Sequence, residues 1–195
     1  IFHMRDQNIS KKILYWYDNN KRLLPWRVHK SQKQKEYFTL VSEIMLQQTQ
    51  VKTVIPYFEN FIKKIPDLKA LANVNDQKLF KCWEGLGYYS RARNLKKAAK
   101  KIIEEFSGKL PDNIDQLKSL PGIGEYTSSA IMAIGFNKPF IPLDGNVERI
   151  LKRFLYLKSD QEITKDNLHK KKSLFGISKR SCDYAQAIME IGALI

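Results

Sequence analysis

Two carboxylic acids lie in surroundings that can give them a chemical role. Glu43 and two amides interrupt an otherwise apolar stretch at residues 42–48 (Ser-Glu-Ile-Met-Leu-Gln-Gln), and Asp144 lies far downstream at a turn, residues 143–147 (Leu-Asp-Gly-Asn-Val). A glutamic acid held among apolar side chains loses hydration when it ionises, so its pKa rises and it can act as a general acid. One neutral acid paired with one ionised acid is the arrangement that cleaves glycosidic bonds.

Each acid also has an ordinary structural explanation. Glu43, Gln47 and Gln50 fall at helical spacing, and this spacing by itself favours a solvated helix face. Asp144 precedes a predicted helix and is placed to cap it by accepting a hydrogen bond from a free backbone N–H. A capping aspartate stays ionised and can stabilise a nearby positive charge, so the two roles of Asp144 are compatible. Glu43 has a chemical role only if it lies in a pocket.

A glycine-rich hairpin lies between the acids, at residues 120–124 (Leu120-Pro-Gly122-Ile-Gly124). Its two glycines lack side chains, so the backbone can approach an anion closely. The N–H groups of the hairpin and of the next helix can then bind a phosphate. The alternative is a simple turn between helices, but Thr127 and Ser128 just downstream favour phosphate binding, which is independent of base sequence.

Tyr88 and Tyr89 directly precede a helix that carries Arg91 and Arg93. Aromatic side chains interleaved with arginines suit stacking on bases or insertion into a duplex. A core aromatic beside a solvated basic helix face has the same pattern. Both interpretations remain open.

The charge of the chain indicates a polyanionic partner. Among 195 residues, 34 are Lys or Arg and 20 are Asp or Glu, which gives a net charge of +14. This excess favours nucleic acid or an acidic membrane surface, although a protein that is merely basic has the same balance. No apolar run approaches the roughly 18 residues of a membrane helix. Cys82 and Cys182 form no CxxC pair, so we expect free thiols in a reducing cytoplasm.

Apolar residues recur with helical period along the whole chain, and no long stretch alternates as a strand does. The sequence therefore predicts an all-α fold. The expected elements are a first helix capped by Ser10 and ending near Asn19 and Asn20, a lysine-rich surface loop between Trp26 and Glu43, helical spacing over residues 37–64, short helices after Asp67 and Asn75, a basic helix over about 89–106, a short helix at 112–118, a helix of small residues ending at Gly135, a helix opened by Asp144, and two helices at roughly 163–175 and 183–195.

Four blocks, in this order, resemble the helix-hairpin-helix DNA glycosylases, and among them the MutY family of adenine DNA glycosylases. The blocks are residues 42–51 (Ser-Glu-Ile-Met-Leu-Gln-Gln-Thr-Gln-Val), 83–89 (Trp-Glu-Gly-Leu-Gly-Tyr-Tyr), 91–95 (Arg-Ala-Arg-Asn-Leu) and 143–147 (Leu-Asp-Gly-Asn-Val). The likeness extends from Leu24 to Ala193, nearly the whole chain. Any single block is a weak signal, whereas their joint occurrence is specific.

The resemblance implies a fold of two helical lobes. A six-helix barrel containing the helix-hairpin-helix would span residues 30–137, and residues 1–29 and 138–195 would form the second lobe. DNA and an extruded base would occupy the cleft between them. The implied activity is hydrolysis of the N-glycosidic bond of adenine mispaired with 8-oxoguanine or guanine in double-stranded DNA, in base excision repair. The resemblance further implies a monomer in the bacterial cytoplasm, with no membrane partner.

The resemblance also assigns roles to side chains. Glu43 would protonate a ring nitrogen of adenine. Asp144 would stabilise the sugar oxocarbenium, with or without a transient covalent bond, while Asn146 orients it and Tyr126 assists. Gln48 and Tyr88 match positions that wedge into the duplex. The remaining candidates for substrate or DNA binding are Arg27, Leu46, Gln47, Leu120, Gly122, Gly124, Thr127 and Gln186, of which Arg27, Leu46 and Gln186 would line the adenine pocket.

Position 126 bears on the type of reaction. The related endonuclease III family has a lysine nucleophile there, which cleaves the strand through a Schiff base. Tyr126 therefore predicts a monofunctional glycosylase, and together with Glu43 it disfavours an endonuclease III-like bifunctional glycosylase/lyase.

Family members also carry four cysteines, spaced C-x6-C-x2-C-x5-C, that hold a 4Fe–4S cluster, and a C-terminal domain that reads 8-oxoguanine. Both would follow Ile195, and Cys82 and Cys182 cannot replace the ligands. The cluster is thus expected for a full-length family member, with its ligands absent from this chain. A non-catalytic helix-hairpin-helix fragment that binds DNA is the alternative function.

Overall fold

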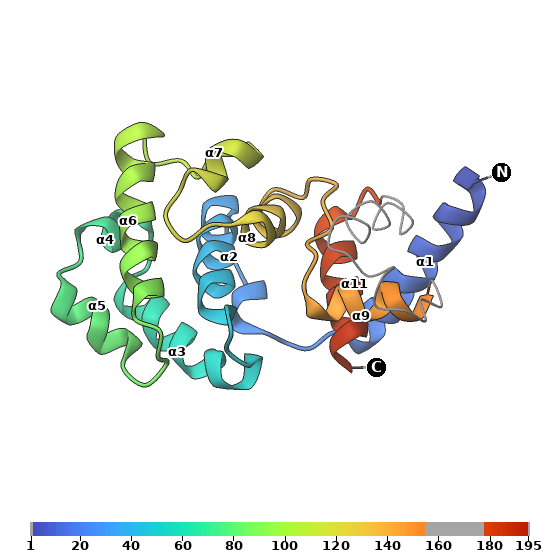
Figure 1. Cartoon of the computed structure of the whole chain (residues 1–195), viewed down its shortest axis with the longest axis horizontal. Helices are drawn as coiled ribbons and strands as arrows, with labels where there is room; N and C mark the ends of the chain where they lie inside the picture. Colours follow the sequence, from blue (N-terminus) through green and yellow to red (C-terminus); the bar gives the residue numbers. More distant parts are fainter. Residues whose placement is uncertain (1, 155–177, 195) are drawn as a thin grey trace.

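Figure 1 shows an elongated arrangement of helices in which both ends of the chain lie in the same lobe. This computed structural model describes residues 2–154 and 178–194, and the helix predicted at 163–175 lies outside them. The predicted all-α fold is confirmed, because the described residues form helices and turns and no strand. The elements are α1 (Phe2–Asn20), η1 (Pro25–Arg27), α2 (Gln32–Leu46), α3 (Val51–Lys64), α4 (Leu68–Asn73), α5 (Asp76–Trp83), α6 (Ser90–Glu105), α7 (Ile114–Lys118), α8 (Glu125–Ala130), the π-helical turn η2 (Ile131–Gly135), α9 (Gly145–Phe154) and α11 (Ser181–Leu194).

The larger lobe is built around α2, which lies near its centre (Figure 1). Residues 37–45 of α2 are all buried, because α3, α6, α8 and η2 pack around this helix. Leu40 and Met45 share one hydrophobic core with Phe58 and Trp83 from α3 and α5. Burying one such side chain contributes about 1.5–3 kcal/mol. A helix enclosed in this way can also hold a polar group away from water.

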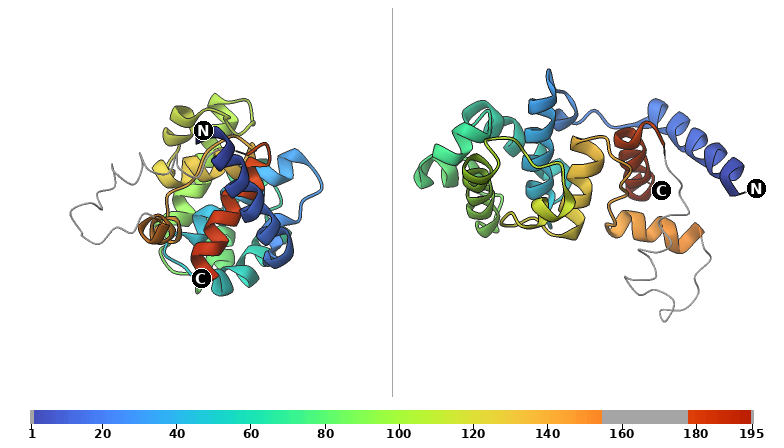
Figure 2. Two further views of the ribbon diagram at one scale, coloured as in Figure 1. Left: turned by 90° about the vertical axis from the view of Figure 1, so that its right-hand side faces the viewer. Right: turned by 90° about the horizontal axis from the view of Figure 1, so that it is seen from above.

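The smaller lobe joins the two ends of the chain. Helix α11 packs against α1 and α9, and the views in Figure 2 show the three helices together beside the larger lobe. Their shared core consists of Leu14, Val147, Leu151, Tyr184 and Ile188. Arg180, directly before α11, adds an ion pair to α1, with its Nη2 2.7 Å from Oδ1 of Asp18. The assignment of residues 30–137 to one lobe and the rest to the other stays a prediction.

Helix caps bear out several of the predicted starts. Asp67 accepts a hydrogen bond from Ala70 N at 2.8 Å, and Asn75 accepts one from Lys78 N at 2.7 Å. Each side chain satisfies a backbone donor that the first turn of a helix leaves free.

Among residues 2–154 and 178–194, none of the helices combines the length and the apolar character that crossing a bilayer requires.

Three of the predicted boundaries are wrong. Ser10 does not cap α1, which already begins at Phe2, and Ser10 is buried inside it. The lysine-rich loop is short, because Ser31 caps α2 by accepting from Gln34 N and the polar residues that follow are its exposed first turn. Residues 37–64 are not one helix, since α2 ends at Leu46 and α3 begins at Val51.

Candidate active site

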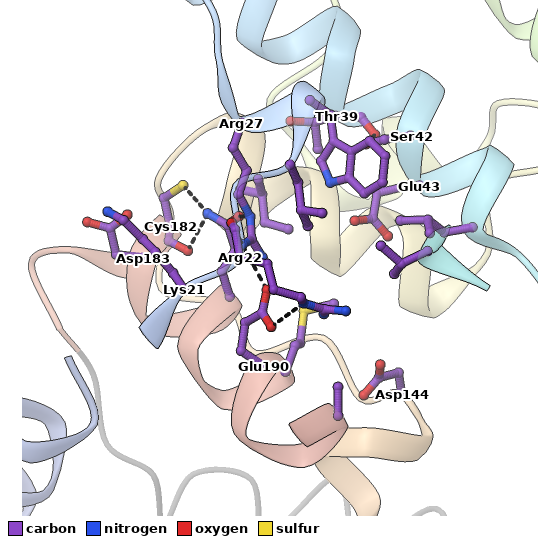
Figure 3. Close-up of a pocket in the computed structure, with 18 of the residues that line it drawn as sticks. Lys21, Arg22, Arg27, Thr39, Ser42, Glu43, Asp144, Cys182, Asp183 and Glu190 are labelled. Atoms are coloured by element: carbon purple, nitrogen blue, oxygen red, sulfur yellow. Dashed lines mark hydrogen bonds and ion pairs between the residues drawn. The ribbon is translucent and has the colours of Figure 1, made fainter. Parts of the chain in front are cut away.

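A cleft of about 920 Å³ lies between the lobes, with walls from segments far apart in the sequence. Helices α2 and α8 supply one wall, α11 and the start of α9 supply another, and residues 21–29 cross beside it (Figure 3). The cleft is lined by these predicted site residues: Arg27, Glu43, Leu46, Gln47, Gln48, Tyr126, Asp144, Asn146 and Gln186. The other predicted site residues lie outside the lining: Tyr88, Leu120, Gly122, Gly124 and Thr127. The residues predicted to line the adenine pocket therefore lie in the cleft, whereas the residues of the glycine hairpin lie outside it.

Glu43 is the buried acid of the cleft. Its side chain is 4% exposed and points from α2 toward the open space in Figure 3, and its Oε2 has no hydrogen-bond partner among the described residues. Burial raises its pKa to about 7, against a hydrogen bond from Tyr126 that lowers it, and the charge of Asp144 raises it further. The carboxyl therefore keeps its proton in a large share of the molecules near neutrality, unlike an exposed glutamate. The solvated helix face predicted for Glu43, Gln47 and Gln50 is wrong, because α2 ends before the two glutamines.

Tyr126 faces the same carboxyl from α8. Its side chain is partly buried, and burial with the nearby charges of Glu43 and Asp144 raises the pKa of its hydroxyl, which stays protonated. A neutral phenol can donate a hydrogen bond but does not supply an amine. The site therefore has no nitrogen nucleophile at this position.

Asp144 lies across the cleft and caps α9, as predicted. Its Oδ1 accepts from Val147 N at 2.8 Å, and its Oδ2 accepts from Asn146 Nδ2 at 3.0 Å. Burial raises the pKa of Asp144 above its ordinary value, although these hydrogen bonds limit the rise, and no such donors from the backbone act on Glu43. The two environments differ in a way that keeps the proton on Glu43 and the negative charge on Asp144.

We expect Glu43 to make the stability of the fold depend on pH. Its folded pKa of about 7 lies above the ordinary value of 4.5, so the folded state binds the proton more tightly than the unfolded state. The contribution of this protonation to the free energy of unfolding is fully present below about pH 4.5. It is lost as the pH rises through 7, by about 3 kcal/mol in total. In urea titrations, the unfolding free energy of Glu43→Gln minus that of the parent should rise by this amount between pH 4.5 and 8.

The matched control for this titration is Glu104→Gln, at an exposed position of α6 outside the cleft. This variant shows what the exchange of a glutamate for a glutamine does at the surface, away from the cleft. A flat difference between Glu43→Gln and the parent would mean that the carboxyl of Glu43 titrates alike in the folded and unfolded chain.

Glu190 is a cleft residue that the sequence interpretation missed. It is 1% exposed on α11, with Oε2 2.7 Å from Nε of Arg22 and Oε1 2.8 Å from Nη1 of Arg27 (Figure 3). Arg27 also donates from Nε to Oε1 of Gln186 at 2.5 Å. The available signal was an acid inside an apolar stretch of residues 185–195, the same signal that singled out Glu43. These groups give the wall a fixed set of donors and acceptors.

The hairpin is joined to the end of α2 from the outside of the cleft. Nε2 of Gln47 lies 3.2 Å from both the Gly122 carbonyl and the Thr127 hydroxyl, and Thr127 is buried. Gly122 has φ +80°, and a Cβ there would lie 2.9 Å from Cβ of Asn94 on α6, so glycine is required for this turn to pack. Phosphate binding by the hairpin backbone stays a prediction.

Arg91 rules out one of the two interpretations left open for this segment, in which the arginines of α6 form a solvated basic face. Arg91 is buried and donates its hydrogen bonds to backbone carbonyls, so it does not belong to an exposed basic face. Tyr88 and Gln48 are exposed, and both have positive φ, +48° and +57°. Their wedging role stays a prediction.

A family profile matches over most of the chain. Residues 41–173 match the profile described as HhH-GPD superfamily base excision DNA repair protein. The chain belongs to this superfamily. The matched segment contains Glu43 and Asp144, the glycine hairpin, and the exposed residues Gln48 and Tyr88.

Curated relatives of this HhH-GPD chain are adenine DNA glycosylases. One from Buchnera aphidicola subsp. Baizongia pistaciae is 40% identical over 184 residues, which are 94% of this chain and 51% of that protein. The human adenine DNA glycosylase is 39% identical over 194 residues, again 94% of this chain but 35% of that protein. The chain therefore spans about half or less of the length of these relatives.

Solved structures share the HhH-GPD fold. A thermostable thymine-DNA glycosylase superposes with a TM-score of 0.82 at 25% identity, over 99% of this chain and 88% of that one. An endonuclease III trapped covalently on DNA superposes with a TM-score of 0.74 at 20% identity, over 95% of this chain and 83% of that one. The second likeness concerns the fold alone.

The described residues do not fit an iron–sulfur cluster. No group of three or more His, Cys, Asp or Glu side chains in residues 2–154 and 178–194 is placed to hold a metal ion. Both cysteines are free thiols, Cys82 in the larger core and Cys182 beside the cleft.

Proposed function

We propose that this HhH-GPD protein is a monofunctional adenine DNA glycosylase, which hydrolyses the N-glycosidic bond of adenine mispaired with 8-oxoguanine or guanine in duplex DNA. The observation that carries the proposal is the pair of carboxyls in one cleft, a buried Glu43 with a pKa of about 7 and an Asp144 that caps α9. The names of the relatives, adenine DNA glycosylases from bacteria and animals, support the choice of base.

The chemistry divides between these two groups. Glu43 donates its proton to a ring nitrogen of the extruded adenine, so the bond between the base and sugar C1′ breaks with its electron pair leaving on a neutral base. The negative charge of Asp144 stabilises the cationic sugar. Water then adds hydroxide to C1′ and returns a proton to the carboxyls, which restores the pair.

The remaining wall suits recognition of the base. Arg27, Gln186 and Glu190 present fixed donors and acceptors beside the cleft, as the edge of a purine requires. Tyr126 cannot form the Schiff base that a lysine forms, so base release proceeds without strand cleavage.

A duplex assay tests this function. We expect the chain to release adenine opposite 8-oxoguanine and opposite guanine, with a strand break only after alkali and with no adduct trapped by borohydride. Strand cleavage without alkali, together with a protein–DNA adduct trapped by borohydride, would identify a bifunctional enzyme instead. Duplex binding without release of any base would leave the non-catalytic DNA-binding fragment.

A further inference from the structure

Arg91 is a buried cation that joins two separate segments of the backbone. Its Nη1 donates to the carbonyls of Met45 at 2.8 Å and Ile44 at 3.3 Å, and also to the carbonyl of Gln47. Its Nη2 donates to the carbonyls of residues 86 and 87, each at 3.3 Å. One guanidinium therefore binds both the end of α2 and the turn before α6.

This arrangement is a costly way to stabilise a core. Arg91 is 7% exposed, and no carboxylate of the described residues lies within ion-pair distance of it. Its charge is balanced by backbone carbonyls, including those at the negative end of α2. An apolar side chain of similar size is often as stable at such a position. The planar fork of arginine, which can hold carbonyls on two segments at once, has a geometric consequence that an apolar side chain lacks.

The carbonyls that Arg91 binds lie next to two exposed residues at the tips of turns, Gln48 and Tyr88. Gln47 directly precedes Gln48, and Gly87 directly precedes Tyr88. Both tips are non-glycine residues in the left-handed region, a conformation that costs about 1–3 kcal/mol and persists only when neighbouring contacts hold it.

Tyr88 is held by Arg91 in two further ways. The guanidinium lies 5.4 Å from the centre of its ring, and the backbone N–H of Arg91 donates to its carbonyl at 2.9 Å. The ring nevertheless stays 62% exposed, so it is available to a partner. The side chain of Arg91 thus contacts the backbone beside both Gln48 and Tyr88 and holds the two residues in their left-handed conformation.

We infer that Arg91 is a positioning residue, which holds Gln48 and Tyr88 in a fixed relation so that both enter the duplex together and extrude the target base. The inference rests on the proposed function. It assigns Arg91 to the separation of the bases and not to the hydrolysis that follows.

A fluorescent duplex tests the inference. The probe carries 2-aminopurine beside the target adenine, which is placed opposite 8-oxoguanine. The parent protein is the Glu43→Gln chain, in which release of the base is expected to be about 10³-fold slower. Binding of this parent should raise the fluorescence of the probe, because the neighbouring base becomes unstacked. Arg91→Lys in the same chain keeps the positive charge but cannot bridge the two segments, so it should bind within about threefold at low salt yet lose the rise in fluorescence.

Two measurements make the test specific. Arg153→Lys, at an exposed position of α9 outside the cleft, is the matched control and should behave as the parent does. Thermal melting followed by circular dichroism shows whether each variant folds cooperatively. In the chain that retains Glu43, Arg91→Lys should lower the single-turnover rate of adenine release by about 10²-fold.

Two results would overturn the inference. One is an Arg91→Lys protein that unstacks the probe as fully as its parent. The other is an Arg91→Lys protein that no longer melts cooperatively, because Arg91 would then serve the fold as a whole. A parent that binds the duplex without unstacking the probe would contradict the proposed function itself, and the inference with it.

Discussion

Adenine release should fall by about 10³-fold when Glu43 is replaced by glutamine, because the amide has no acidic proton to donate to the leaving base. Glutamine keeps the shape of the side chain, and Glu43 is a buried residue that lines the cleft. Single-turnover rates on an adenine:8-oxoguanine duplex measure the effect. The affinity for the duplex and its dependence on salt should be unchanged, since these arise from basic groups at the surface.

The exposed Glu104→Gln protein is again the matched control and should release adenine at the rate of the parent. A Glu43→Gln protein that retained the rate of the parent would exclude Glu43 as the acid. Loss of duplex affinity together with activity would indicate instead that the substitution disturbs the cleft.

The second large effect is expected at Gly192, which packs α11 against the turn that carries Asp144. A Cβ at Gly192 would lie 2.4 Å from the Asn146 carbonyl oxygen and 2.7 Å from its carbon, so Gly192→Ala must displace this backbone. Asn146 donates to Asp144, and a displacement of about 1 Å at a reacting group can lower a rate by about 10²-fold. We therefore expect kcat to fall by about 10²-fold, with a smaller change in KM.

Gly135→Ala is the matched control for this substitution. A Cβ at Gly135 meets its nearest neighbour, Cγ2 of Ile131, at 3.7 Å, which is an ordinary contact. This variant should keep both its rate and its melting temperature. An unchanged kcat in Gly192→Ala would show that the turn can move without disturbing Asp144.

Much of the fold could be predicted because the apolar residues recur with a regular period. The cap at Asp144 was also predictable, since an aspartate before a helix binds the backbone beside it. The gap between α2 and α3 could not be found in this way. No glycine or proline interrupts residues 46–51, and the left-handed Gln48 is stabilised by contacts with α6 that the local sequence does not contain.

Arg91 shows where a simple rule misleads. A basic residue on a basic helix is easily assigned to a solvated face, yet Arg91 lies four residues before Leu95 and so shares the buried face of α6. The surroundings of Glu43 are likewise only partly predictable from the sequence. Its apolar neighbours in sequence indicate burial, but its pKa depends on Tyr126 and Asp144, which only the fold brings close.

The joining of both chain ends in the smaller lobe has a consequence for biosynthesis. Asp18 on α1 leaves the ribosome before its partner Arg180, which directly precedes α11 and follows 162 residues later. The larger lobe can thus acquire its core during translation, whereas α1 waits for its neighbours. The wall of the cleft that contains Glu190 therefore forms after the wall that contains Glu43. During synthesis, Glu43 is in place before the cleft that would bind a nucleobase is complete.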